Sequence, residues 1–171
     1  ETLFFLFAVA GNETLRNGIP GGVLTLIEHA DQYDRLLSAP ALLPTAIEEM
    51  LRFWPPVIHF RRTATTDVEL AGARIRAGDK VAVYHIAANR DPGVFPEPHR
   101  FDITRTPNDH VSFGFGPHFC LGAHLARSQM RRMVGEINDR LGRLELAGEP
   151  VRLQSNFQQG LKHLPVRRTQ A

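Results

Sequence analysis

The most reactive side chain in the sequence belongs to Cys120, the single cysteine among 171 residues. It lies in the stretch Phe113–Gly122, which contains glycines at positions 114, 116 and 122. Glycine allows the backbone to approach a neighbouring group closely, in this case the sulfur. A helix is expected to begin directly after Cys120, and the unpaired N–H groups at a helix start stabilise a thiolate. A thiolate binds a metal or attacks an electrophile.

The residues around the sulfur leave its role open. A cysteine in a glycine-rich turn fits an inert, buried residue. His118, Cys120 and His124 fit the three protein ligands of a catalytic zinc, although their spacing follows no established zinc pattern. A dinucleotide-binding loop is excluded, because the glycines do not follow the G-x-G-x-x-G spacing and no strand leads into them.

Two further pairs of residues can take part in chemistry. Glu49 and Arg52 are three positions apart on an expected helix, so they share a face and can form an ion pair. Glu13 and Thr14 follow an apolar run, where an acid next to a hydroxyl can relay protons, and Gly11 loosens the helix just before them. For both pairs the simpler alternative is a solvated helix face, where an ion pair contributes only about 0.2–0.5 kcal/mol.

The hydrophobic patterning predicts that a helix-rich α+β chain positions these residues. Helices are expected over residues 2–17, 23–29, 31–37, 44–53 and 121–141. The run Gly18–Gly22 contains Pro20 and is expected to break or kink the first helix. A hairpin is expected from residues 68–70 and 74–76, with further strands over 80–84, 144–146, 151–153 and 161–166. Four prolines between residues 92 and 107 predict an irregular meander.

The composition excludes several classes of protein. Hydrophobic residues make up 43% and charged residues 22% of the chain, which is typical of a globular domain. A net charge of +2 gives no indication of a nucleic-acid partner. A single cysteine excludes an internal disulfide framework and favours a reducing, cytoplasmic compartment. The longest apolar run, residues 3–10, is too short for a membrane span.

Taken together, the motifs resemble those of cytochrome P450. The family's pattern F-x-x-G-x-x-x-C-x-G is present as Phe113, Gly116, Cys120 and Gly122. The residues that follow, Ala123–Arg127, are similar to soluble bacterial members.

Two other segments carry the same resemblance. Glu49 and Arg52 match the family's E-x-x-R motif, and Arg100 occupies the place of the arginine that completes a structural triad. Ala10–Thr14 is similar to the A-G-x-[DE]-T segment of the family's long central helix.

The resemblance implies haem b as the cofactor, O2 as co-substrate and Cys120 as the axial ligand of the haem iron. It assigns the haem propionates to Arg62 and His118, and the proton relay to Glu13 and Thr14. The cofactor contacts implied by the resemblance are Ala10, Gly11, Arg62, Phe113, Gly114, Gly116, His118 and Gly122. Substrate contacts are implied for Val57, Ile58 and Phe157.

The function implied by the resemblance is that of a haem-thiolate monooxygenase, which inserts one atom of O2 into a C–H bond of a hydrophobic substrate. The similar bacterial members act on steroids, terpenoids or branched lipids. Electrons are expected from a ferredoxin and its reductase, with Arg131 and Arg132 steering the ferredoxin. The alternatives are a haem-binding or gas-sensing module, a non-catalytic truncated relic and, last, a zinc hydrolase.

The expected fold is the mainly helical C-terminal part of the cytochrome P450 fold. Residues 1–171 are expected to form a single partial domain that lacks the N-terminal portion of the family. The isolated chain is therefore expected to be inactive.

Overall fold

The computed structural model of the protein describes residues 2–169. Its helices are α1 (Thr2–Glu28), α2 (Ala30–Ser38), α3 (Leu43–Phe53), α4 (His85–Ala88) and α5 (Ala123–Leu141), with 3-10 turns η1 (Pro40–Leu42) and η2 (Gly116–His118). Its strands are β1 (His59–Thr63), β2 (Val68–Leu70), β3 (Ala73–Ile75), β4 (Lys80–Tyr84), β5 (Leu144–Leu146), β6 (Val151–Arg152), β7 (Leu161–His163) and β8 (Val166–Arg168). The expected class, mainly helical α+β, is confirmed.

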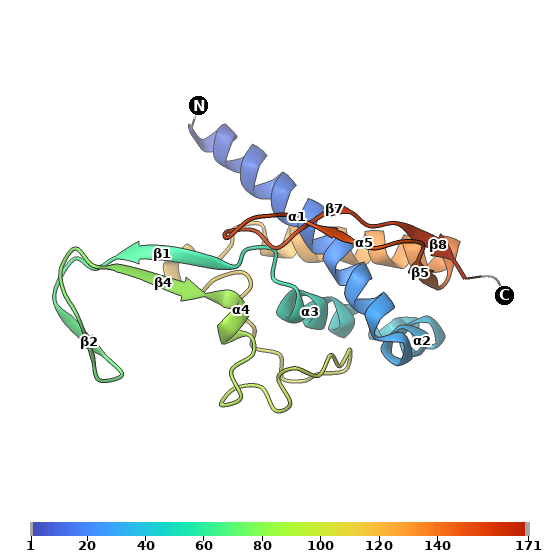
Figure 1. Ribbon diagram of the computed structural model, residues 1–171, viewed down its shortest axis with the longest axis horizontal. Coiled ribbons are helices and arrows are strands. Elements are labelled where there is room, and N and C mark those ends of the chain that lie inside the picture. Colours follow the sequence, from blue (N-terminus) through green and yellow to red (C-terminus); the bar gives the residue numbers. More distant parts are fainter. Residues whose placement is uncertain (1, 170–171) are drawn as a thin grey trace.

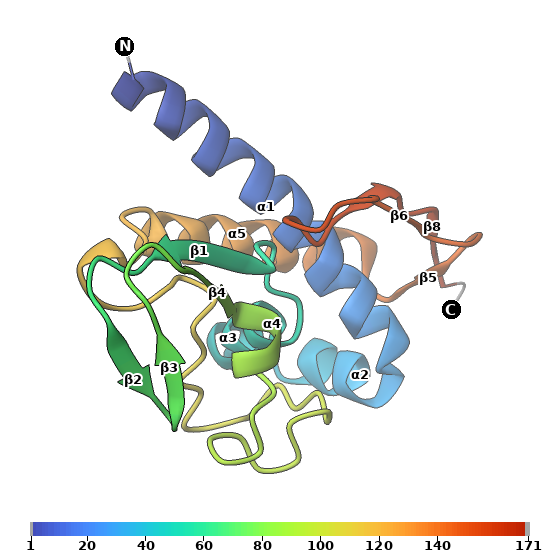
Figure 2. The same cartoon turned by 60° about the vertical axis from the view of Figure 1, so that its left-hand side comes forward.

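The strands form antiparallel pairs rather than one large sheet. β1 pairs with β4, β2 with β3, β5 with β8 and β6 with β7. In the first pair His59 lies opposite Tyr84, and Thr63 lies opposite Lys80. Figures 1 and 2 show the β1–β4 pair on one side of a helical body, with the β2–β3 hairpin at its far end. The C-terminal pairs lie along the other side, next to α1 and α5.

The core lies where α1, α3 and α5 meet, since apolar residues on the facing sides of these helices are removed from water. α2, the meander after α4 and β5 close this core. Its buried members are Val23, Leu26, Tyr33, Leu36, Ala46, Ile47, Met50, Leu51, Phe101, Ile103, Met130, Val134 and Leu144.

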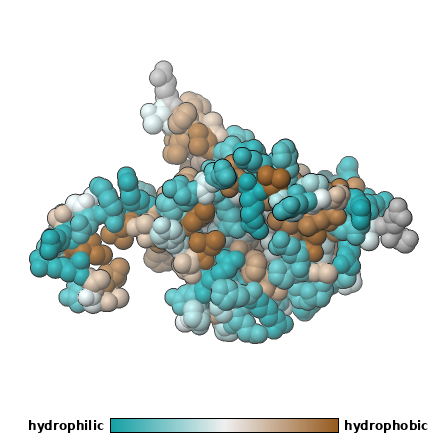
Figure 3. All heavy atoms as spheres, in the orientation of Figure 1, coloured by the Kyte–Doolittle hydropathy of each residue, from teal (hydrophilic) through white to brown (hydrophobic). Residues whose placement is uncertain are grey.

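The two ends of α1 have different surroundings. Residues 21–26 are buried against α3, whereas the apolar side chains of residues 3–9 are exposed, with Phe4 80% exposed. This exposed half extends away from the body in Figures 1 and 2 and forms an apolar projection in Figure 3. No helix in residues 2–169 combines the length and the apolar character that a membrane crossing needs.

A break or a kink was expected at residues 18–22, and the break is wrong, because α1 continues as one helix through Pro20 to Glu28. The glycines that suggested a break instead allow close helix packing. A Cβ at Gly21 would overlap the Trp54 indole, and one at Gly22 would touch the Met50 side chain at 3.0 Å. Burial of this packed surface outweighs the local cost of proline and glycine in a helix.

Replacing Gly21 by alanine is expected to lower the free energy of unfolding by about 1–3 kcal/mol, because the added methyl group overpacks the contact with Trp54. Gly11→Ala is the matched control on the same helix, since its Cβ would meet nothing within 4 Å. That control is expected to raise the free energy by up to about 1 kcal/mol through helix propensity. Chemical unfolding followed by circular dichroism measures both variants, and equal effects would contradict the packing contact.

Candidate functional site

The loop between η2 and α5 presents Cys120 at the surface, so the alternative of a buried cysteine is wrong. The Cys120 N–H donates to the carbonyl of Phe113 at 2.9 Å, which folds the loop back on itself. Gly114 and Gly116 have φ angles of +75° and +72°, a region that favours glycine. The glycines therefore set the turn that exposes the thiol.

An apolar surface surrounds the thiol. Phe115 is 89% exposed and Leu121 is 83% exposed, and Phe119 and Leu125 are also exposed. Isolated exposed apolar residues are common, but neighbouring ones around a reactive sulfur indicate a surface that a large apolar group covers.

Two groups able to carry positive charge remain available for an anion. The Arg62 side chain, exposed on β1, donates to the carbonyl of Arg61 and lies 5.9 Å from the centre of the Phe60 ring. Within residues 2–169 it makes no ion pair with a carboxylate. His118, the last residue of η2, is exposed.

Beneath the loop, Glu49 and Arg52 form a fully buried ion pair, with Nε and Nη2 of Arg52 at 2.7 and 2.8 Å from the two carboxylate oxygens. The other N–H groups of Arg52 donate to backbone carbonyls of Asn89, Pro98 and Arg100 at 2.8–3.0 Å. All five donors of the guanidinium are thereby satisfied. The pair fixes the meander to α3.

The prediction that Arg100 is the third member of this network is wrong. Its side chain is exposed and pairs with Glu97 at 3.0 Å, and only its backbone carbonyl reaches Arg52. Arg105 takes the place instead, with Nε 3.3 Å from Glu49 and a side chain that is 9% exposed. The meander turns after Phe101, so the side chain of Arg105, four positions later, points back towards α3.

A second charged cluster, which the sequence analysis missed, braces the cysteine loop from the side. Arg127 on α5 makes two hydrogen bonds of 2.7 and 2.8 Å with Glu48 on α3. Its guanidinium lies 4.5 Å from the centre of the Phe113 ring. The buried ring of His110 contributes a hydrogen bond of 3.2 Å to Glu48, and its Nδ1 accepts from the backbone N–H of Ser112.

The protonation of this cluster follows from its contacts. Because Nδ1 of His110 accepts a hydrogen bond, Nε2 carries the proton that is donated to Glu48. Burial opposes ionisation of Glu48, but hydrogen bonds from His110 and Arg127 and the charge of Arg127 outweigh it and lower its pKa to about 2.

The acid–hydroxyl pair of α1 is intact in the structure. Thr14 Oγ1 donates to the carbonyl of Ala10 at 2.7 Å. The Glu13 carboxylate is paired with Arg16 one turn later at 2.8 Å, and its side chain is 38% exposed. Glu13 thus has access to solvent, while the Thr14 hydroxyl oxygen can still accept a hydrogen bond.

The three predicted substrate contacts are brought together from distant parts of the chain. Ile58 N–H donates to the carbonyl of Phe157 at 2.9 Å, and Val57 pairs with Gln158 in an isolated bridge. The Phe157 ring lies 6.0 Å from the ring of His59. The segment just before β1 and the C-terminal turn, from which these contacts were predicted, are therefore joined through their backbones.

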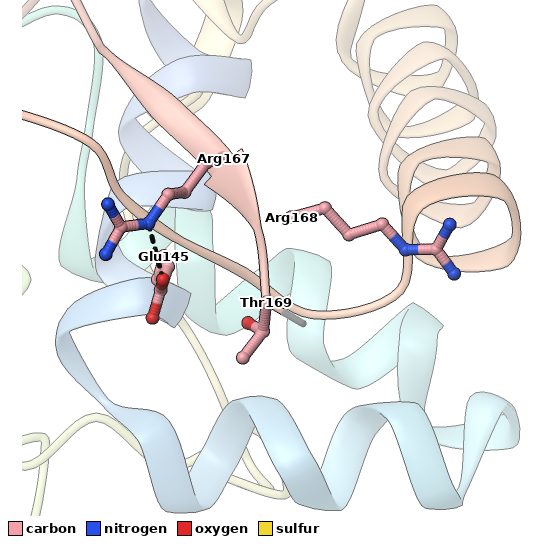
Figure 4. A pocket seen from close by; sticks show the side chains of 4 residues that line it. All are labelled: Glu145, Arg167, Arg168 and Thr169. Atoms are coloured by element: carbon pink, nitrogen blue, oxygen red, sulfur yellow. Dashed lines mark hydrogen bonds and ion pairs between the residues drawn. The ribbon is translucent and has the colours of Figure 1, made fainter. Parts of the chain in front are cut away.

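Two other candidate sites carry no chemistry. Within residues 2–169, no group of three or more His, Cys, Asp or Glu side chains is placed to hold a metal ion, so His118, Cys120 and His124 do not form a zinc site. An open hollow of about 420 Å³ lies on the β5–β8 pair, beyond the other end of α5 from Cys120. Figure 4 shows that Arg167 and Glu145 in this hollow already pair with each other, at 2.6 Å.

The family of the chain follows from comparison with known sequences. A profile of the family described as Cytochrome P450 matches residues 4–141. Because this match covers more than half of the residues, the chain belongs to the cytochrome P450 family. Members of this family use haem with an axial thiolate and O2.

Individual relatives agree with this assignment. The chain is 47% identical over 167 residues to a methyl-branched lipid omega-hydroxylase of Mycobacterium tuberculosis, covering 96% of this chain and 39% of the relative. It is 46% identical over 161 residues to linalool 8-monooxygenase of Pseudomonas putida, covering 94% of this chain and 40% of the relative. The chain thus spans about two fifths of the length of these relatives.

The fold also matches solved members of the family. The structure of CYP109E1 from Bacillus megaterium in complex with testosterone superposes with a TM-score of 0.93 at 40% identity. The match covers 96% of this chain and 45% of that one. The expectation of a partial cytochrome P450 fold is confirmed.

Proposed function

We propose that the protein to which this chain belongs is a haem-thiolate monooxygenase that oxidises a C–H bond of a hydrophobic substrate. The observation that carries the proposal is the exposed thiol of Cys120, held by a glycine turn at the start of α5 within an exposed apolar surface. A thiolate is the ligand that this family uses to activate O2 on haem iron.

The residues present fit haem b as the cofactor. Cys120 would supply the thiolate ligand of the haem iron, and Arg62 and His118 would hold the two propionates. The flat macrocycle can lie close to the loop backbone where the side chain is only a hydrogen atom. The glycines of the loop meet this condition, and a Cβ on Gly116 would meet nothing within 4 Å. The remaining contacts proposed for the cofactor are Ala10, Gly11, Phe113, Gly114 and Gly122.

Glu13 and Thr14 are proposed to deliver protons. Glu13 takes a proton from solvent at its carboxylate, since its side chain is partly exposed. Thr14 Oγ1 donates to the carbonyl of Ala10 and keeps its lone pairs free, so it would accept a hydrogen bond from a water that carries the proton onward. Bound haem supplies the oxidising chemistry, and this pair supplies the protons that the reaction consumes. The intact relay favours an enzyme over a gas-sensing module or a relic.

The proposed substrates are branched lipids, terpenoids or steroids. The names of the relatives include a methyl-branched lipid omega-hydroxylase and linalool 8-monooxygenase. Val57, Ile58 and Phe157 offer an apolar surface that suits such molecules.

The proposed electron donor is a ferredoxin with its reductase, in the cytoplasm. α5 begins at the cysteine loop and carries two exposed arginines that could attract an acidic protein. Arg131 Nε donates to the carbonyl of Arg127, while Arg132 pairs with Glu136 at 2.8 Å. Arg131, which makes no ion pair in the described chain, is therefore the stronger candidate of the two.

The reduced, carbon monoxide-bound absorption spectrum tests the proposal. A strongly red-shifted Soret band is expected from the longer protein that contains this chain, and loss of that band is expected in Cys120→Ala. The far-UV circular dichroism of the variant is expected to be unchanged, since Cys120 is exposed. Absence of the band from a folded longer protein after haem reconstitution would refute the proposal.

A further inference from the structure

We propose that Asn17 and Gln158 are positioning residues that fix Phe157 in the substrate pocket and thereby determine which carbon of the substrate is oxidised. This inference rests on the proposed monooxygenase function. The inference goes beyond that function because it assigns the selectivity for one substrate carbon to two polar side chains that need not touch the substrate.

The first observation is a polar contact between distant parts of the chain. Asn17, in the middle of α1, is only 1% exposed. Its Nδ2 donates to Oε1 of Gln158 at 3.3 Å, which joins residues 141 positions apart in the sequence. Gly160 packs on the same side chain, since a Cβ there would overlap Asn17 Oδ1. The turn of residues 155–160 is therefore held against α1 by a hydrogen bond and by a contact that only glycine permits.

The second observation is that the same turn is held from its other side. The backbone N–H of Gln159 donates to the carbonyl of Pro56 at 2.9 Å, and that of Ile58 donates to the carbonyl of Phe157 at 2.9 Å. Gly18, next to Asn17, approaches Pro56 as well, since a Cβ on Gly18 would lie 3.0 Å from its Cγ. α1, the segment before β1 and the C-terminal turn thus meet at one point.

The side chain that this arrangement places is Phe157. Its backbone N–H donates to Ser155 Oγ at 3.1 Å, which shapes the turn. Its ring remains 39% exposed and lies 5.8 Å from the ring of Phe60. An aromatic ring that is anchored through its backbone and is partly exposed is suited to contact an apolar ligand.

The third observation connects the turn to the proton relay. Asn17 follows Thr14 by three positions in α1, so both side chains lie on neighbouring positions of one helix face. The helix that carries Thr14 therefore also sets the position of Phe157. Loosening the Asn17–Gln158 contact would let the ring move relative to the reacting end of the site, and the bound substrate would present a different carbon.

The test compares Asn17→Ala and Gln158→Ala with the wild type in the longer, haem-loaded protein. Linalool, testosterone and a methyl-branched fatty acid serve as substrates, and the ratio of product isomers is measured. Each variant is expected to change this ratio by about threefold to tenfold, and the double variant by no more than the larger single change, because both remove one contact. Gln154→Ala, an exposed glutamine four residues before Gln158, is the matched control and is expected to leave the ratio unchanged.

A second pair of variants separates the effect of losing the Asn17–Gln158 contact from a general loss of stability. Gly160→Ala is expected to lower the unfolding temperature, because its methyl group overlaps Asn17. Adding Asn17→Ala removes the overlapping oxygen, so the double variant is expected to regain the unfolding temperature while its product ratio stays altered. Hydrogen exchange at the Ile58 amide reports on the turn without any turnover, and Asn17→Ala is expected to accelerate it.

An active wild type whose product ratio and Ile58 amide exchange are both unchanged in Asn17→Ala would overturn the inference while leaving the proposed function intact. A folded longer protein without the red-shifted Soret band after haem reconstitution would contradict the proposed function and, with it, this inference.

Discussion

Methionine in place of Arg52 is expected to lower the free energy of unfolding by about 3–5 kcal/mol, because it leaves the buried carboxylate of Glu49 without its main partner. The substitution also removes the donors for three backbone carbonyls of the meander. Since the meander leads directly into the cysteine loop, the variant is expected to lose bound haem before it loses helix content. Denaturant unfolding and the rate of haem loss measure the two effects.

Arg100 and Arg105 provide the matched comparison for this prediction. Arg105→Met removes a buried contact with Glu49, and is expected to cost about 1–3 kcal/mol. Arg100→Met removes only an exposed pair with Glu97, and is expected to cost less than about 1 kcal/mol. Equal losses in the two variants would mean that the network does not close through Arg105.

Acid is expected to destabilise the protein through Glu48. Its pKa in the folded protein, about 2, lies below the ordinary value of 4.5, so its ionised form stabilises the fold at neutral pH. This contribution is complete above about pH 5 and is lost as the pH falls towards about 2. Over this range the wild type is expected to lose about 3 kcal/mol more stability than Glu48→Gln, which cannot titrate at this position.

The measurement is the free energy of unfolding by urea at a series of pH values. Glu136→Gln is a suitable control, because Glu136 makes only pairs with exposed arginines on α5. If the wild type and Glu48→Gln showed parallel pH profiles, the contacts with His110 and Arg127 would not hold the Glu48 carboxylate in its ionised form.

The elements that were predicted correctly have strong local signals. α3 was expected over residues 44–53 and ends at Phe53, just before Pro55 and Pro56. β4 and β5 match their predicted ranges, and the β2–β3 hairpin lies at the predicted Gly72 turn. Proline and glycine act through the backbone of their own neighbourhood, so sequence alone reveals their effect.

The elements that were missed depend on partners far away in the sequence. β1 contains His59, Phe60, Arg61, Arg62 and Thr63, and lacks the alternation of a half-buried strand because it is mostly exposed on both faces. It forms a strand because β4 pairs with it. α4 is only one turn long, too short to show any periodicity.

The residues of the site divide in the same way into those with a local sequence signal and those that depend on the fold. Fixed spacings singled out Cys120 and the pair Glu49 and Arg52, and the structure contains that ion pair. Arg100 was placed in the network by the same kind of argument, but Arg105 contacts Glu49 instead. The meander has no regular period, so position along it does not reveal which side chain points inward. Glu48 was missed because only the fold determines that it faces α5 while its neighbour Glu49 faces the meander.

The contact between Asn17 and Gln158 also has a consequence for how the molecule assembles. A contact between residues 141 positions apart closes a long loop. The chain loses conformational entropy on closing this loop before the contact can stabilise the fold. The C-terminal turn is therefore expected to dock late in folding, after the helical body and the cysteine loop have formed. During synthesis from the N-terminus, the turn that carries Phe157 would join the site after Asn17 and the cysteine loop had already been made.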